Sequence, residues 1–460
     1  MAFEIRSPVD GSRIFREPAS PQNLAETLLK STAAQKSWRQ FALSDRANLL
    51  LEATNALMGR SDLIATEITH QMGRPIRFSA GEVAGFAHRA RAMIDLAGPS
   101  LCDLTLEKEE GCNRFIRREP LGVVLALCAW NYPYLIAANT VIPALMAGNA
   151  VILKHADQTP SCPERLAEAF AAAGLPDGVF QYIHMDHDLT ATAIADPRIS
   201  HVAFTGSVSG GRAVHRAAGG HFKTVGLELG GNDPAYVRAD ADLDHAVENL
   251  VDGALFNSGQ SCCGVERIYV HSDLFTPFVE RFAETVRTYV LGDPRDPETT
   301  LGPVIHTAAA DRIRAVVADA VARGARPLID PALFPMAAPG TPYVAPQVLV
   351  DVEEDMPLMR EEVFGPVVGI APVDSDEEAL ARMNDSPYGL TASLWTRDEE
   401  AAIALGEQLE TGTVFMNRCD YLDPSLAWVG VKNSGRGCTL STVGYEHLTR
   451  PKSYHLRRRA

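Results

Sequence analysis

The sequence lacks the apolar run of about 18 residues or more that crosses a bilayer, so we expect no membrane span. Its first residues, MAFEIRSPVDGSRIF, carry charges where an export signal needs an apolar stretch, and we therefore expect a cytoplasmic protein. Positive charge is in deficit, because 42 Lys and Arg stand against 58 Asp and Glu, a formal net charge of −16. Since the basic residues are scattered apart from three arginines at 457–459, we expect no nucleic-acid partner.

Cysteine is scarce as well, and its spacing argues against two kinds of site. The eight cysteines do not form the C-x-x-C pairs of zinc sites, and they are too few for a disulfide scaffold in a chain of 460 residues. We therefore expect mostly reduced thiols and no metal. One arrangement is unusual, because Cys262 and Cys263 are adjacent.

The chain is too long for a single hydrophobic core, so we expect two large lobes. Apolar residues recur every three or four positions in three segments between 23 and 98, which predicts amphipathic helices, the second over 44–73. The next segment, LCDLTLEKEEGCNRFIRREP, alternates around a central EEG turn and predicts a hairpin. An oligomerisation arm would have this form, and the C-terminal KSYHLRRRA would add an edge strand.

Apolar strands alternate with helical segments over 119–231, as in an open doubly wound parallel sheet, and a second alternating series runs from DLDHAVENLVDGALF to GTVFMN. We predict an α/β fold with two doubly wound open-sheet domains and a small β oligomerisation arm. The domain predicted to bind a dinucleotide comprises residues 1–101 and 119–227. The catalytic domain comprises 228–436, and the arm comprises 102–118 and 437–460.

The dinucleotide fingerprint G-x-G-x-x-G is absent, which argues against an ordinary Rossmann dehydrogenase. The segment FTGSVSGG at 204–211 offers another way to hold a phosphate. Gly206 permits a tight turn after a strand, Ser207 can cap the following helix, and Gly211 allows close approach. The pattern alone fits a plain strand-to-helix turn equally well.

Three short segments carry groups suited to covalent catalysis. FNSGQSCCGVER at 256–267 sets two thiols among small and polar residues, which fits either a nucleophile or a buried cysteine pair. In LELGG, Glu228 stands between two leucines, where burial would raise its pKa toward neutrality unless a core cation pairs with it. In AWNYP, Asn131 can donate a hydrogen bond to an oxyanion.

Together these segments resemble the aldehyde dehydrogenase superfamily, and the likeness is collinear over essentially the whole chain. The family's P-W-N-x-P appears as AWNYP, its K-x-x-E-x-T-P as KHADQTP at 154–160, and its F-T-G-S-x-x-x-G at 204–211. Its L-E-L-G-G is unchanged, its G-Q-x-C is GQSC at 259–262, and its E-E-x-F-G-P is EEVFGP at 361–366.

The resemblance implies that Cys262 is the nucleophile, that Glu228 is the general base, and that Asn131 binds the oxyanion together with the Cys262 N–H. It implies oxidation of an aldehyde to a carboxylic acid through a thiohemiacetal and a thioester, with NAD(P) as cofactor. An acidic residue at Asp157, near the ribose hydroxyls, favours NAD over NADP. With the glycines of the turn, the residues expected to contact the dinucleotide are Trp130, Lys154, Asp157, Gly206, Ser207, Gly211, Leu229, Glu362 and Phe364.

The substrate is less defined by the resemblance. Ala129 stands where the family usually has proline, and Asn232 is familiar among semialdehyde dehydrogenases and favours that branch. The walls of the substrate pocket are expected from Tyr132, Ser261, Cys263, Arg418, Leu422 and Trp428. We expect a medium aliphatic or aromatic aldehyde first, and a carboxylate-bearing semialdehyde that needs Arg418 second.

Two other functions remain open at this point. An acylating dehydrogenase would pass the thioester to coenzyme A, but Glu228 argues for hydrolysis. A non-enzymatic binding or structural protein is disfavoured by the intact Cys262, Glu228 and Asn131. The resemblance also implies a homodimer or a homotetramer.

Overall fold

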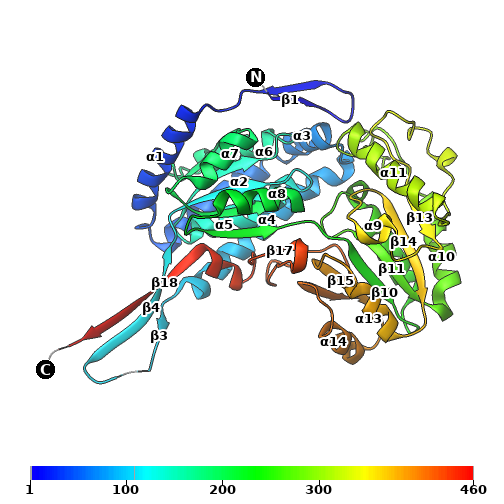
Figure 1. Ribbon diagram of the computed structural model, residues 1–460. Coiled ribbons are helices and arrows are strands. Elements are labelled where there is room, and N and C mark those ends of the chain that lie inside the picture. Colours follow the sequence, from blue (N-terminus) through cyan, green and yellow to red (C-terminus); the bar gives the residue numbers. More distant parts are fainter. Residues whose placement is uncertain (1–2, 108, 459–460) are drawn as a thin grey trace.

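The computed structural model describes residues 3–107 and 109–458 and shows an α/β chain with two mainly parallel sheets and a projecting three-stranded arm (Figure 1). An N-terminal antiparallel hairpin of β1 (Phe3–Arg6) and β2 (Arg13–Arg16) precedes the first helix. Within the described ranges, no helix is long and apolar enough to span a bilayer.

The helices at the start of the chain are α1 (Pro21–Trp38), α2 (Leu43–Met58), α3 (Ser61–Met72) and α4 (Ile76–Leu101). The single helix expected over 44–73 is therefore two helices. The N–H of Gly59 closes the last turn of α2 on the Asn55 carbonyl, and Arg60 is non-helical, with φ −113° and ψ 17°. Glycine has a low helix propensity, so the chain turns there at little cost.

The first sheet has the order β17-β9-β8-β5-β6-β7. Its parallel strands are β5 (Val123–Cys128), β6 (Ala150–His155), β7 (Phe180–Tyr182), β8 (Ile199–Thr205) and β9 (Thr224–Glu228). The short β17 (Gly435–Arg436) pairs antiparallel with β9. The helices between these strands are α5 (Pro133–Met146), α6 (Ser161–Ala172), α7 (His187–Ala195) and α8 (Val208–Ala218).

The second sheet has the order β12-β13-β14-β11-β10-β15-β16. Its parallel strands are β10 (Asp233–Val237), β11 (Val265–His271), β13 (Gln347–Val350), β14 (Val367–Val373), β15 (Thr391–Trp395) and β16 (Thr413–Met416), and β12 (Arg326–Pro327) is antiparallel. The accompanying helices are α9 (Leu243–Leu255), α10 (Ser272–Arg287), α11 (Thr307–Ala322), α12 (Pro357–Arg360), α13 (Asp376–Asn384) and α14 (Glu399–Gly406). Short 3-10 turns are η1 (Phe256–Gly259), η2 (Pro331–Leu333), η3 (Lys432–Ser434) and η4 (Val443–Leu448).

The arm contains β3 (Leu104–Thr105), β4 (Cys112–Pro120) and β18 (Thr449–Arg457). β18 pairs antiparallel with β4 from Thr449↔Pro120 to Arg457↔Cys112, so the hairpin and the C-terminal edge strand both form. Figure 1 shows this sheet extending away from the two main lobes. The segment before β18 instead joins the first lobe, because Leu440, Tyr445 and Leu448 belong to the core that α2, α4 and α5 build.

Two of the three candidate catalytic groups, Asn131 and Glu228, lie at the carboxyl ends of parallel strands, and the third, Cys262, precedes a strand. β5 leads into Trp130 and Asn131, β8 leads into Gly206, and β9 ends on Glu228. Cys262 lies in the loop that enters β11 of the second sheet. In open α/β sheets, ligands bind outside the carboxyl ends of strands, so the fold directs these groups into one region.

Candidate active site

Cys262 lies where two cavities meet. One has a volume of about 350 Å³ and the other about 320 Å³, and both are lined by Cys262, Glu228, Leu229 and Thr205. The larger cavity contains Tyr132, Leu422 and Trp428, whereas the other contains Trp130, Gly206, Ser207, Glu362 and Phe364. A thiol in this position can react with a molecule in either cavity.

The loop that carries Cys262 is held in an uncommon backbone conformation. Asn257 and Ser258 have φ of 54° and 56°, in the left-handed region. Gly259 also has positive φ, and a Cβ there would lie 2.1 Å from the Gly365 carbonyl oxygen. Left-handed residues and a required glycine give a tight turn directly before the thiol, and such conformations recur at functional sites.

Asn131 lies beside this loop. Its side-chain Nδ2 donates to the Gln260 carbonyl at 3.2 Å, and Asn257 Nδ2 donates to the Asn131 carbonyl at 3.1 Å. The buried Arg74 ties the two segments together, because its Nη2 donates to the Asn131 carbonyl at 2.5 Å and its Nε to Asn257 Oδ1 at 3.1 Å. Arg74 also forms a buried ion pair with Glu82. Nothing in its local sequence marked Arg74 as part of the site.

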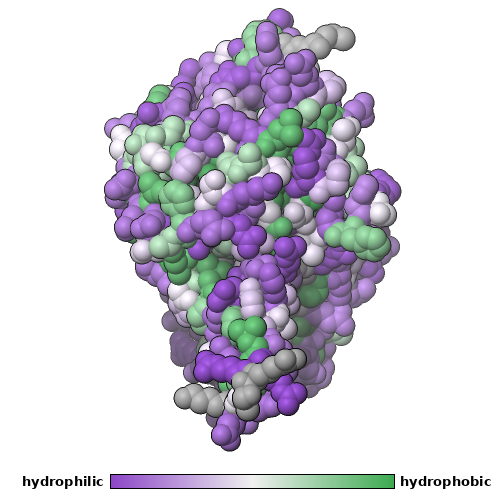
Figure 2. Space-filling model, turned by 90° about the vertical axis from the view of Figure 1, so that its left-hand side faces the viewer, coloured by the Kyte–Doolittle hydropathy of each residue, from purple (hydrophilic) through white to green (hydrophobic). Residues whose placement is uncertain are grey.

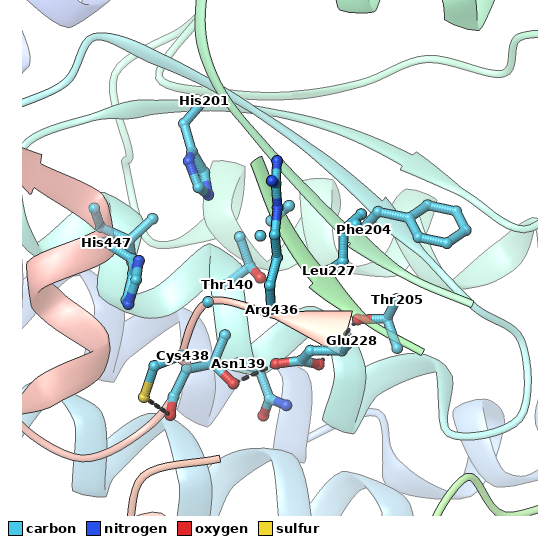
Figure 3. A pocket seen from close by; sticks show the side chains of 15 residues that line it. Asn139, Thr140, His201, Phe204, Thr205, Leu227, Glu228, Arg436, Cys438 and His447 are labelled. Atoms are coloured by element: carbon cyan, nitrogen blue, oxygen red, sulfur yellow. Dashed lines mark hydrogen bonds between the residues drawn. The ribbon is translucent and has the colours of Figure 1, made fainter. Parts of the chain in front are cut away.

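Glu228 ends β9 and is bound by two threonines. Its Oε2 accepts a hydrogen bond from Thr205 Oγ1 at 3.0 Å, and its Oε1 accepts one from Thr439 Oγ1 (Figure 3). No lysine, arginine or histidine of the described residues forms an ion pair with it. Burial raises the pKa of Glu228 above its ordinary value, while the two threonine hydrogen bonds and the charge of Arg89 oppose that rise.

A third, much smaller cavity lies behind Glu228. Its volume is about 20 Å³, and Figure 3 shows Asn139, His201, Arg436 and His447 around it. A space of this size holds about one water molecule. Glu228 therefore borders both large cavities and this small space.

The two adjacent thiols have different surroundings. Cys262 opens onto both large cavities, whereas Cys263 is buried with 2% of its surface exposed. The pKa of Cys263 is well above its usual value because of its hydrogen bond with Cys262, its burial and the charge of Asp420. A thiol with a raised pKa is a poor nucleophile at neutral pH, so the geometry favours Cys262.

The smaller of the two large cavities has the features of a dinucleotide site. Trp130 and Phe364 pack edge to face at 5.7 Å, and Ser207 caps α8 by accepting from the Gly210 N–H at 3.1 Å. Glu362 accepts from the Gly231 N–H at 3.1 Å, and burial raises its pKa to about 8. Apolar walls, a glycine-rich helix start and a carboxyl group fit a nicotinamide dinucleotide.

Three residues predicted to contact the dinucleotide do not line this cavity. Lys154 and Asp157 lie at the end of β6 and bind each other, with Lys154 Nζ 2.9 Å from Asp157 Oδ1. Gly211 packs against Leu229, and a Cβ at Gly211 would come within 2.6 Å of the Leu229 side chain. Gly211 therefore supports Leu229, which does line the cavity.

The larger cavity includes five of the six predicted substrate residues: Tyr132, Ser261, Cys263, Leu422 and Trp428. The structure does not bring Arg418 into it, because that guanidinium lies over the Tyr421 ring at 3.3 Å. Asp420, from the same expected loop as Arg418, lines it instead, together with three ionisable groups that the sequence did not indicate: His88, Arg89 and Asp252. Arg89 Nη1 donates to the Leu135 carbonyl at 3.0 Å and to Asn139 Oδ1 at 2.8 Å.

Comparison with known proteins adds the following. The sequence pattern of the aldehyde dehydrogenase family matches residues 1–454. The chain is 36% identical over 439 residues to succinate semialdehyde dehydrogenase [NAD(P)+] Sad of Escherichia coli (strain K12), covering 95% of this chain and 94% of that protein. It is 36% identical over 457 residues to succinate-semialdehyde dehydrogenase [NADP(+)] 1 of Mycobacterium ulcerans (strain Agy99), covering 98% and 99%. Among solved structures, an NAD-dependent aldehyde dehydrogenase from Sinorhizobium meliloti superposes with a TM-score of 0.94 at 30% identity, covering 99% of this chain and 92% of that one.

Proposed function

The chain belongs to the aldehyde dehydrogenase family and is an NAD(P)-dependent enzyme, and on that premise we propose that Cys262 and Glu228 oxidise an aldehyde to its carboxylic acid. The observation that carries this proposal is the shared position of both side chains, which border the two large cavities at once. Of the described thiols, Cys262 alone lines both cavities, so it is the one that can meet substrate and cofactor together.

In this scheme Cys262 Sγ forms a bond to the aldehyde carbon, and the carbonyl oxygen takes the negative charge. Asn131 and the Cys262 N–H stabilise that oxygen, a contribution of about 3 kcal/mol for one donor. Trp130, Leu229 and Phe364 line the cavity that would hold NAD(P), and the bound cofactor would supply the hydride acceptor needed to oxidise the adduct to a thioester. Glu228 then takes a proton from water, the hydroxide attacks the thioester carbon, and the Cys262 thiolate leaves.

The test is turnover of a panel of aldehydes with each cofactor, followed by reduced cofactor absorbance and by analysis of the product. We expect free carboxylic acid with no need for coenzyme A, because Glu228 is in place to activate water. Formation of an acyl-coenzyme A product in preference to the acid would replace this proposal with the acylating reaction.

For the substrate we propose a medium aliphatic or aromatic aldehyde. Leu135, Ile136, Phe256, Leu422 and Trp428 give the larger cavity apolar walls, and its volume of about 350 Å³ suits a molecule of that size. A series of straight-chain and benzylic aldehydes tests this choice. A value of kcat/KM that rises with chain length and then falls sharply supports an apolar pocket of limited depth.

A second candidate is an aldehyde that also carries a carboxylate, and Arg89 favours it. Arg89 lines the cavity and is buried, with 8% of its surface exposed. Among the described residues, only its Nη1 donates hydrogen bonds, to the Leu135 carbonyl and to Asn139 Oδ1. The Escherichia coli and Mycobacterium ulcerans relatives are both named as succinate semialdehyde dehydrogenases. Two aldehydes of equal length, one ending in carboxylate and one in methyl, distinguish the candidates by their kcat/KM.

We further propose that NAD is preferred over NADP. The Lys154–Asp157 pair supports this, since Asp157 offsets the positive charge that a 2′-phosphate would need and repels the phosphate itself. The names of the three relatives differ in cofactor: NAD(P)+ for the Escherichia coli enzyme, NADP(+) for the Mycobacterium ulcerans enzyme and NAD for the Sinorhizobium meliloti enzyme. Steady-state kinetics with both cofactors decide the question.

We also propose that the arm of β3, β4 and β18 joins subunits into a homodimer or homotetramer, in a protein that works in the cytoplasm on small molecules. Leu104, Leu106 and Leu456 of the arm are exposed, and Phe115 and Tyr454 stack at 4.5 Å on it. On the side of the molecule in Figure 2, hydrophobic residues are scattered among hydrophilic ones. Light scattering on the purified protein measures the assembly, and a monomer would contradict it.

A further inference from the structure

Both residues that flank Cys262 are held by a single carboxylate oxygen. Ser261 Oγ donates a hydrogen bond to Asp420 Oδ1 at 2.7 Å, and Cys263 Sγ donates to the same oxygen at 3.0 Å. Ser261 and Cys263 are buried, while Cys262 between them opens onto the two large cavities. An acceptor that binds the residues before and after a nucleophile restricts the backbone of the nucleophile itself.

Asp420 is itself firmly placed. It lies in the loop after β16, where Asn417 and Asp420 have φ of 53° and 44°. The side chain of Asn417 anchors the start of this loop to Thr396, with hydrogen bonds of 2.8 Å and 3.0 Å. Asn and Asp adopt left-handed conformations more readily than other side-chain-bearing residues, so the sequence suits the turn.

We propose that Asp420 is a positioning residue that fixes Ser261 and Cys263, and thereby keeps the Sγ and N–H of Cys262 aligned with Asn131. This inference rests on the proposed role of Cys262 as the nucleophile. On the other side of the thiol, Asn131 and Asn257 both donate to the Gln260 carbonyl at 3.2 Å. The two asparagine amides therefore bind the loop at Gln260, before the nucleophile, and Asp420 binds the residues on either side of the nucleophile.

The same contact separates the chemistry of the two neighbouring thiols. Cys263 gives its proton to a hydrogen bond with Asp420, and its pKa is well above the usual value. Burial raises the pKa of Asp420, and the hydrogen bonds from Cys263 and Ser261 act in the opposite direction. Cys263 thus stays a thiol that donates, while Cys262 remains the thiol that reacts.

Asp420 lines the substrate cavity, so its carboxylate could act on the substrate instead. Asp252 provides the matched control, because it lines the same cavity and, within the described residues, makes no hydrogen bond to residues 261–263. Asp252→Asn removes a carboxylate charge from the cavity and nothing else. It does not remove the hydrogen bonds that Asp420 accepts from Ser261 and Cys263.

The experiment compares Asp420→Asn, Asp420→Gly and Asp252→Asn with the unmodified enzyme, using a short neutral aldehyde. Asn retains an acceptor oxygen, so its kcat should stay within about threefold of the unmodified enzyme. Gly tolerates the left-handed backbone but has no acceptor, so kcat should fall about 100-fold while KM changes by less than about threefold. Asp252→Asn removes a charge from the cavity and leaves the loop contact in place, so it should lower kcat much less than Asp420→Gly does.

A double variant, Ser261→Ala with Cys263→Ala, removes both donors and leaves Asp420 intact. This double variant should show the same loss of kcat as Asp420→Gly. It replaces the glycine variant in the comparison if Asp420→Gly has a markedly lower melting temperature than the unmodified enzyme. Peptide mapping after iodoacetamide gives a readout without turnover: Cys263 should become labelled in Asp420→Gly but not in Asp420→Asn.

Several results would overturn the inference. Full kcat in Asp420→Gly would show that no positioning occurs, and equal losses in the asparagine and glycine variants would show that the negative charge matters rather than the acceptor. A rise in KM alone would assign Asp420 to the substrate. Failure of the unmodified enzyme to form an acid would instead refute the proposed function, and the labelling comparison would still test the Asp420 contact.

Discussion

The two cavities that meet at Cys262 are similar in volume, about 350 Å³ and about 320 Å³, but they are built from different parts of the chain. The cavity proposed for the dinucleotide is formed mainly by residues that follow strands closely, such as Trp130, Gly206 and Leu229. The cavity proposed for the aldehyde takes its charged groups from helices and from a loop, as Arg89, Asp252 and Asp420 show. The lining of the first cavity is determined by the sheet. The charged residues of the second can be substituted without altering the strands or the residues that both cavities share.

The largest expected effect concerns the residue that both cavities share. Cys262→Ala should abolish oxidation, because no other described thiol lines both cavities. Cys263→Ala should lower kcat by less than about tenfold, since Ser261 still donates to Asp420. Initial rates of NADH formation measure both. Activity that survives in Cys262→Ala and disappears in Cys263→Ala would reassign the nucleophile.

Glu228 should produce the next largest effect, at the second step only. Glu228→Gln should release one NADH per site in a burst and then stall about 10²- to 10⁴-fold below the unmodified rate, because a neutral amide cannot take the proton from water. An acyl adduct on the intact protein should appear by mass spectrometry. Absence of the burst would show that Glu228 acts before hydride transfer.

The same residue sets the acid side of the pH profile. Burial raises the pKa of Glu228, and the base works only when it is ionised, so activity should fall as the pH drops through a value above its ordinary 4.5. A profile of kcat against pH in the unmodified enzyme checks this. A plateau that extends below pH 4.5 would contradict the raised pKa.

Arg89 should discriminate between aldehydes within the larger cavity. If a substrate carboxylate binds its guanidinium, Arg89→Met should lower kcat/KM for the carboxylate-bearing aldehyde about 10- to 150-fold relative to the neutral one of equal length. Arg91→Met, on the same helix but exposed, is the control. Equal losses for both aldehydes would leave Arg89 with a general role near Glu228 instead.

The smallest expected effect lies at the far end of the dinucleotide. Asp157→Ser should raise kcat/KM with NADP by about tenfold, because it removes the carboxylate that pairs with Lys154 and repels a 2′-phosphate. Kinetics with both cofactors measure the change. Equal use of NAD and NADP by the unmodified enzyme, unchanged in the variant, would show that Asp157 does not select the cofactor.

Much of the site could be predicted from the sequence, because it is encoded in short segments at strand ends. Asn131 and Glu228 lie where β5 and β9 end, and parallel strands bring their carboxyl ends together wherever the sheet forms. Cys262 lies instead in the loop before β11, where two adjacent thiols stand among small and polar residues. The strands themselves can be predicted because β5 and the first four residues of β6 are continuous apolar runs.

The charged residues of the aldehyde cavity could not be predicted in this way. Arg89 lies in an ordinary amphipathic helix, and only the packing of α4 against α5 turns it toward the cavity. Arg418 and Asp420 are two residues apart, and left-handed conformations at Asn417 and Asp420 decide that Asp420 faces the nucleophile loop. Such conformations depend on long-range contacts as much as on residue type.

The hydrogen bond from Thr439 to Glu228 joins residues 211 positions apart. Glu228 is therefore synthesised well before the threonine that binds it. A ribosome that adds about 5–20 residues per second needs roughly 10 to 40 s to proceed from one to the other. For most of that interval the growing chain already contains Cys262, but it lacks the threonine that binds Glu228 and, until late, Asp420. Glu228 therefore gains its second hydrogen-bond donor only after β17 has been made and has paired with β9.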